Sequence, residues 1–147
     1  MKNVIVGIAG FAITLFSAGQ ALGQDMPKAH KMENVSWHTV VLVDFEPGKT
    51  DEAMDIINNH FVKAGEKAGN PGPAMELEMQ TGEWDLMLVW NMDSPSEMEW
   101  EVSPEGEKFM KALSEQEGSL KKAQELFDKY QSLIDESTSY IATSDNE

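Results

Sequence analysis

The chain contains no cysteine and no arginine. Without cysteine it can form no disulfide bond, so packing or self-association must stabilise the fold. Without arginine it lacks the preferred bidentate partner of phosphate and carboxylate groups. The formal net charge is −15, from 26 acidic residues against 11 basic ones. Nucleic acids bind to basic surfaces, so we expect no nucleic acid partner, and a highly anionic substrate is disfavoured. The simplest explanation of the acidity is solubility.

Residues 1–23 have the pattern of a secretory signal peptide. Lys2 supplies the positive charge, residues 4–16 form an apolar segment, and small residues follow where a signal peptidase cleaves. The apolar segment is short for a bilayer span, which needs about 20 residues. We therefore expect cleavage before Gln24 and a periplasmic or secreted protein with no stable membrane insertion after cleavage. A retained membrane anchor is the alternative.

Residues 24–34 are polar and contain a proline, which predicts a linker. Met26, His30 and Met32 are residue types that bind copper. Three such residues in a flexible segment fit an unstructured tail better than a metal site. We expect no metal and no other cofactor, and we assign residues 35–147 to a single domain.

The hydrophobic pattern from Val35 onward predicts the order β-α-β-β-α-β. Alternation with period 2, typical of strands, covers residues 35–45, 74–80 and 84–92. Helical patterns follow the first and third strands, over residues 51–67 and 104–134, with a break predicted at Gly118 and a short helix predicted after Ser94. A β-like segment at residues 138–143 closes the chain. This order predicts a ferredoxin-like α+β fold, in which a four-stranded antiparallel sheet carries both helices on one face.

Two segments carry a resemblance to a known group of proteins: WHTVVLVDFEPGKTDEAM (residues 37–54) and GEWDLMLVWNMDSPSEMEW (residues 82–100). With the element order, they resemble the dimeric α+β barrel superfamily. The resemblance implies that two subunits place their sheets face to face around a small cavity, so we expect a homodimer. Members include cofactor-free monooxygenases, haem enzymes and small isomerases. Haem members usually bind iron through a histidine in the second helical region, and residues 95–134 contain none.

Strand parity selects the candidate site. The more apolar strand faces should contact the helices, which leaves Val40, Leu42 and Val89 on an uncovered apolar face that a dimer would bury. Polar or mixed residues of the uncovered face should line the barrel: His38, Asp44, Asp85, Met87 and Asn91. Met75 and Leu77 should face inward, and core packing is the expected role of Trp37, Trp84, Trp90 and Trp100.

Antiparallel pairing of the first and third strands predicts that His38 lies near Asn91. A histidine beside an amide can abstract a proton and stabilise an oxyanion, so His38, Asn91 and Tyr140 are the catalytic candidates. His38, Asp85, Met87 and Asn91 are the candidates for ligand binding. A hydrogen-bonded interface histidine is the alternative for His38, and His60 is expected to be structural.

The sequence thus favours a secreted dimeric barrel protein that binds a small, partly apolar molecule in a cavity on the helix-free sheet face. The alternative is a cofactor-independent monooxygenase or isomerase that acts in the same cavity. A purely structural or interaction module is a third interpretation. Whether the protein is an enzyme stays open at this point.

Overall fold

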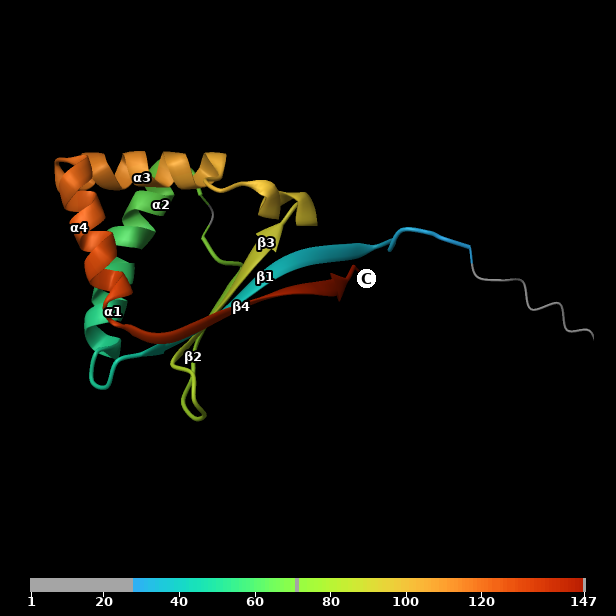
Figure 1. Ribbon diagram of the computed structural model, residues 1–147, viewed down its shortest axis with the longest axis horizontal. Coiled ribbons are helices and arrows are strands. Elements are labelled where there is room, and N and C mark those ends of the chain that lie inside the picture. The colour runs from blue at the N-terminus through green and yellow to red at the C-terminus, as the bar shows by residue number, and fades with distance from the viewer. Residues whose placement is uncertain (1–27, 71, 147) are drawn as a thin grey trace, which may run out of the picture. The chain divides into compact units, whose positions relative to one another are not determined.

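The computed structural model describes residues 28–70 and 72–146, and the predicted signal peptide lies outside them. Residues 32–146 form one compact unit, a four-stranded sheet with helices on one side (Figure 1). The elements are β1 (Val35–Phe45), α1 (Thr50–Ile56), a π-helical turn η1 (Ile57–Phe61), α2 (Val62–Ala68), β2 (Met75–Glu78), β3 (Leu86–Met92), a 3₁₀ turn η2 (Pro95–Glu99), α3 (Pro104–Glu117), α4 (Leu120–Gln131) and β4 (Ile134–Asp145).

All neighbouring strands are antiparallel, and their order in the sheet is β2-β3-β1-β4. This is the ferredoxin-like order, and the predicted α+β class is confirmed. In the described part of the chain, no helix is long and apolar enough to cross a membrane.

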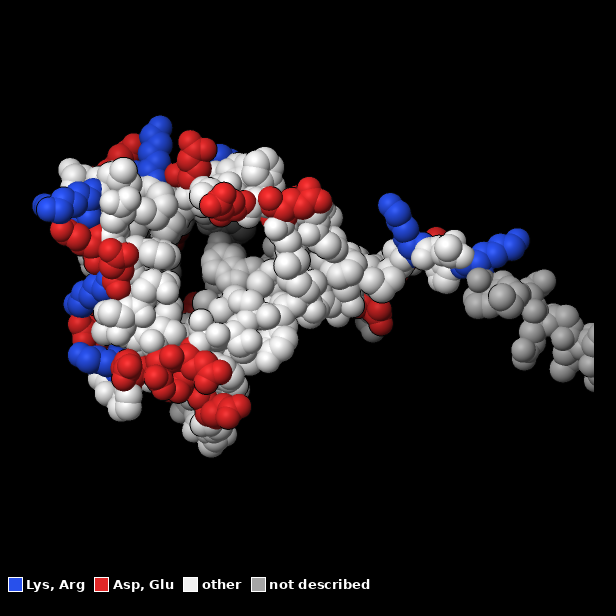
Figure 2. Space-filling model, viewed as in Figure 1, with Lys and Arg blue, Asp and Glu red and all other residues white. Residues whose placement is uncertain are grey.

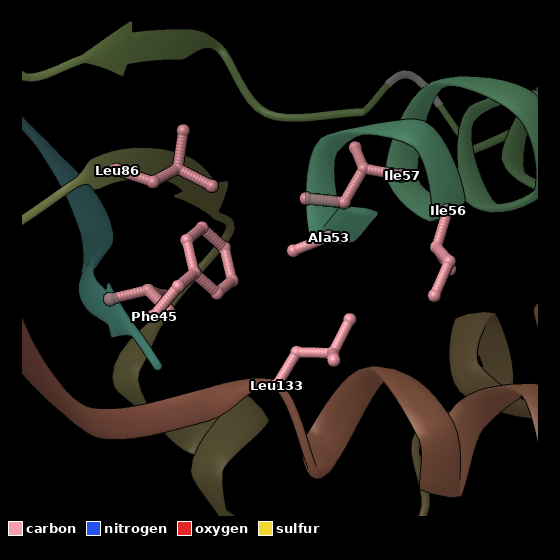
Figure 3. Packing of buried hydrophobic residues seen from close by; sticks show 7 residues of the cluster. Phe45, Ala53, Ile56, Ile57, Leu86 and Leu133 are labelled. Atoms are coloured by element: carbon pink, nitrogen blue, oxygen red, sulfur yellow. The ribbon is translucent and has the colours of Figure 1, made fainter. Parts of the chain in front are cut away.

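The faces of β1 and β3 divide as the period-2 pattern predicts. On the helix-facing side, Val43, Phe45 and Leu86 are buried in a core that Ala53, Ile56, Ile57 and Leu133 complete (Figure 3). On the helix-free side, Val40 lies opposite Val89, and Leu42 lies opposite Met87. A second cluster, which is built around Leu113, joins α2, α3 and α4.

The helices cover only one end of the sheet (Figure 1). Phe45 and Leu86, near α1, are 3% and 1% exposed, whereas Trp90 and Ile141, farther along the same face, are 38% and 39% exposed. The far end of the helix-facing side is therefore open between the sheet and the segments above it.

Local chemistry sets the start of α3 and the break after it at the predicted places, whereas the second helical region ends at Gln131 instead of residue 134. The Ser103 hydroxyl accepts a hydrogen bond from the backbone N–H of Gly106 and caps α3. Gly118 has a φ of 86°, a left-handed conformation that suits glycine, and it separates α3 from α4, where the chain changes direction sharply (Figure 1).

Two expectations about the strands are wrong. Met75 and Leu77 pair with Val89 and Met87, so they lie on the helix-free face, and they are 51% and 42% exposed. The alternation in β2 correctly separates two faces, but it does not say which one the helices cover.

The last strand is longer than predicted, Ile134–Asp145 instead of residues 138–143. Its backbone pairs with β1 from Phe45↔Ile134 to Val35↔Asp145. Most of its side chains are exposed, so the residues near its ends carry no apolar alternation that could reveal a strand.

Candidate functional site

The helix-free face brings together the three catalytic candidates. His38 on β1 lies opposite Asn91 on β3 and Ala142 on β4, and Tyr140 lies opposite Val40 two positions along. Met87, a predicted ligand contact, is on the same face opposite Leu42. Antiparallel register explains this grouping, and the roles of these residues stay predictions.

The His38 ring is held by one hydrogen bond. Its Nε2 lies 2.8 Å from Ser144 Oγ, and its Nδ1 is buried without a partner among the residues that the structure describes. An imidazole has two nitrogens that each donate or accept, and leaving one unsatisfied in a buried place costs about 1–3 kcal/mol. Within the described chain, this ring nitrogen of His38 is therefore an unsatisfied polar atom.

Asp85 does not join this group. Its Oδ2 accepts hydrogen bonds from the Phe45 backbone N–H (3.1 Å) and from the Thr50 hydroxyl (3.2 Å). These bonds fix the start of α1 to the sheet. Asp85 is six residues from Asn91 along the chain, which is about 20 Å in an extended strand. Because His38 lies opposite Asn91, Asp85 and His38 are at opposite ends of the sheet.

The neighbourhood of Asp85 is acidic. Asp44, Asp85, Glu46 and Asp135 line a cavity of about 290 Å³ at the turn between β1 and α1. Within residues 28–70 and 72–146, no three acidic, histidine or cysteine side chains are arranged to hold a metal ion.

The larger cavity lies on the open part of the helix-facing side, where Figure 2 shows the surface hollowed between the helices and the sheet. It has a volume of about 860 Å³. Its walls come from β1, β3, the α2–β2 loop, η2 and the start of α3, with Thr39, Asn70, Trp90, Asn91, Met92, Asp93, Glu97, Met98, Trp100 and Glu105 among the lining residues.

The lining combines large apolar side chains with acidic ones. Trp90 and Trp100 supply aromatic rings, and Met92 and Met98 supply polarizable thioether groups. The Thr39 hydroxyl donates a hydrogen bond to Met92 Sδ (3.0 Å), which fixes this part of the wall. Such a mixture can bind an organic molecule through apolar contact and orient it through polar groups.

Sequence reasoning missed most of this cavity. It assigned Trp90 and Trp100 to the core, but their side chains are 38% and 59% exposed. Of the predicted ligand-binding residues, Asn91 is the one that lines the cavity, although it lies opposite His38 and its strand position assigns its side chain to the helix-free face. A signal was present in η2 and the residue after it, where Met98 and Trp100 interrupt an acidic segment of the sequence.

His60 has the structural role that its position predicts. Its Nδ1 lies 2.8 Å from Glu117 Oε1, and Gln116 donates to the His60 carbonyl, so the π-helical turn is tied to the end of α3. The hydrogen bond with His60 holds the pKa of Glu117 below its ordinary value.

The order of strands and the one-sided helices define an α+β protein with a ferredoxin-like fold. No protein-family model matches the sequence, and no curated protein matches it. Among solved structures, the chain is similar to a NIPSNAP family protein of unknown function from Agrobacterium tumefaciens. The TM-score is 0.52 at 9% sequence identity, over 80% of this chain and 96% of that chain.

A second NIPSNAP family protein from Agrobacterium tumefaciens gives a TM-score of 0.48 at 13% identity, over 74% of this chain and 90% of that chain. At such low identity, the similarity to the first structure shows a common fold and nothing about activity.

Proposed function

We propose that this chain is an exported, homodimeric barrel protein that binds a small, partly apolar molecule. The observation that carries the binding proposal is the cavity of about 860 Å³ with Trp90, Trp100, Met92 and Met98 in its walls. This volume is within the range of about 300–1,000 Å³ that small-molecule sites occupy. We locate the ligand in this cavity instead of on the helix-free face.

The helix-free face supports the dimer. Apolar side chains from all four strands lie on it: Val40, Leu42, Met75, Leu77, Met87, Val89, Tyr140 and Ala142. Full burial of a side chain of valine, leucine or methionine size contributes about 1.5–3 kcal/mol. A second copy related by a twofold axis would cover the face, and it would leave the cavity on the opposite side of the sheet accessible.

A second candidate function is cofactor-independent acid–base chemistry, as in an oxygenase or isomerase, at His38, Asn91 and Tyr140. The position of these three residues on one face of neighbouring strands supports this candidate. If His38 serves a ligand, His38→Gln should weaken binding or turnover at least about 10-fold, while dimer stability changes by under about 1 kcal/mol. If His38 is structural, stability falls and binding by the remaining dimer stays the same.

Native mass spectrometry of the purified protein tests ligand binding directly. We expect a retained small molecule at one copy per subunit. Trp100→Ala should abolish retention because it removes an aromatic wall of the cavity. Val102→Ala is the matched control, since Val102 is an exposed apolar residue in the same segment and does not line the cavity. Retention that survives Trp100→Ala would contradict the assignment of the site.

A further inference from the structure

The ionisable side chains that line the large cavity are all acidic. Among the fifteen residues that line it, three are acidic (Asp93, Glu97 and Glu105) and none is a lysine, arginine or histidine. An anionic ligand would therefore meet repulsion without a compensating cation, whereas a cationic one would find partners.

The N-terminus of α3, which lines the cavity, favours an anion. A helix N-terminus is equivalent to roughly half a positive charge. At this end of α3, the backbone N–H of Gly106 already donates a hydrogen bond to the Ser103 hydroxyl. Pro104 has no N–H that could bind an anion. Three carboxylates outweigh this partial charge, so the cavity stays negative.

One carboxylate is held in place by the backbone. Glu97 Oε1 accepts hydrogen bonds from the N–H groups of Asp93 and Ser94, in the capping box of η2. Because these bonds already restrict the Glu97 side chain, contact with a ligand cation costs little additional side-chain entropy.

Two aromatic rings also favour a cationic ligand. Trp90 and Trp100 come from different elements and are 38% and 59% exposed, so ring surface is available to a ligand. Tryptophan attracts cations over its face more strongly than tyrosine or phenylalanine does, and the attraction is worth about 0.5–2 kcal/mol. Met92 and Met98 add apolar contact for the rest of the molecule.

We propose that the cavity binds an organic cation, an amine or ammonium group on an apolar body, with the charge near the carboxylates and the tryptophan rings. This inference rests on the proposed function, because it names the class of ligand for the same cavity. The volume is far larger than a single ion needs, and the apolar walls require a hydrocarbon part.

Three probes with one hydrocarbon body and different charge test the inference: 4-tert-butylbenzylamine, which is a cation at pH 7, the uncharged 4-tert-butylbenzyl alcohol, and the anion 4-tert-butylbenzoate. Calorimetric titration of the purified protein measures each Kd. We expect the amine to bind at least about 10-fold more tightly than the alcohol, as one cation–π contact and one ion pair predict, and the benzoate to bind most weakly.

Substitutions of the lining carboxylates test whether these residues cause the preference for the amine. Asp93→Asn together with Glu105→Gln should weaken amine binding about 10-fold and change alcohol binding less than about twofold. Glu107→Gln is the matched control, because Glu107 is also acidic and in the first turn of α3 but does not line the cavity. It should leave both affinities unchanged.

The outcomes separate the two proposals. If the alcohol binds as tightly as the amine, or if the benzoate binds best, the organic cation inference is wrong while small-molecule binding stands. The inference is also wrong if Glu107→Gln weakens amine binding as much as the double variant does, since a general surface charge would then explain the preference. If none of the probes binds at millimolar concentration, the proposed function itself fails for this cavity.

Discussion

Replacement of Val89 by lysine should dissociate the proposed dimer. Val89 lies opposite Val40 on one neighbouring strand and Met75 on the other, so it is in the middle of the helix-free face. In a closed barrel its side chain would face the partner subunit. The substitution removes about 2 kcal/mol of valine burial per subunit. It also brings an ammonium group into apolar surroundings without a charge partner.

The size of the electrostatic cost depends on how the lysine responds. Full neutralisation at pH 7 of a group with a pKa of about 10.4 costs about 4.6 kcal/mol, and extension of the side chain to the rim reduces this. Even without any electrostatic cost, a symmetric dimer loses the burial term twice, about 4 kcal/mol in all. The Kd of the dimer should therefore rise at least about 1,000-fold.

Sedimentation equilibrium over the micromolar range measures this change. Ser139→Lys is the matched control, because it adds the same charge at an exposed position on the other face of the sheet, where Ser139 lies opposite Val41. Circular dichroism establishes that both variants keep the fold. A wild-type protein that is monomeric at micromolar concentration would refute the dimer, and so would a Val89→Lys variant that associates as tightly as the wild type.

Three further predictions concern stability and export. A hydrogen bond from Lys129 is the main cause that lowers the pKa of Glu52 from 4.5 to about 2, so its stabilising contribution is complete above pH 4.5 and is lost as the pH falls towards 2. Glu52→Gln should therefore show a smaller decrease in melting temperature than the wild type between these two pH values. Leu113→Ala removes a fully buried side chain and should lower the free energy of unfolding, measured by urea denaturation, by about 2–5 kcal/mol. The control Leu120→Ala, at a position that is 54% exposed, should lower it by under about 1 kcal/mol. N-terminal sequencing of exported protein should begin at Gln24, give or take a few residues, and an uncleaved chain in a membrane fraction would contradict the signal peptide.

The sequence predicts those features of the fold that depend on local chemistry. The serine caps before α3 and η2, the break at Gly118 and the alternation of β1 and β3 each follow from a few neighbouring residues. Register follows as well, since antiparallel pairing of β1 with β3 leads from Val43↔Leu86 to His38↔Asn91.

The cavity depends on tertiary arrangement and could not be predicted in the same way. Parity correctly assigns Trp90 to the helix-facing side of β3. Its exposure is decided by how far the helices extend over the sheet, and they reach the end at Phe45 and Leu86 but not the end at Trp90. The length of β4 is another nonlocal property, because backbone pairing with β1 holds its polar residues in a strand.

Strand β3 connects the two proposed surfaces through neighbouring residues. Val89 belongs to the helix-free face, while Trp90 lines the cavity on the other side of the sheet. If each cavity is complete within one subunit, a folded Val89→Lys monomer should bind 4-tert-butylbenzylamine with the affinity of the wild type. Loss of binding together with dimerisation, in a variant whose circular dichroism is unchanged, would mean that the partner subunit shapes the cavity. Because side chains alternate between the two faces of a strand, substitutions at Val89 and Trp90 test association and ligand binding separately.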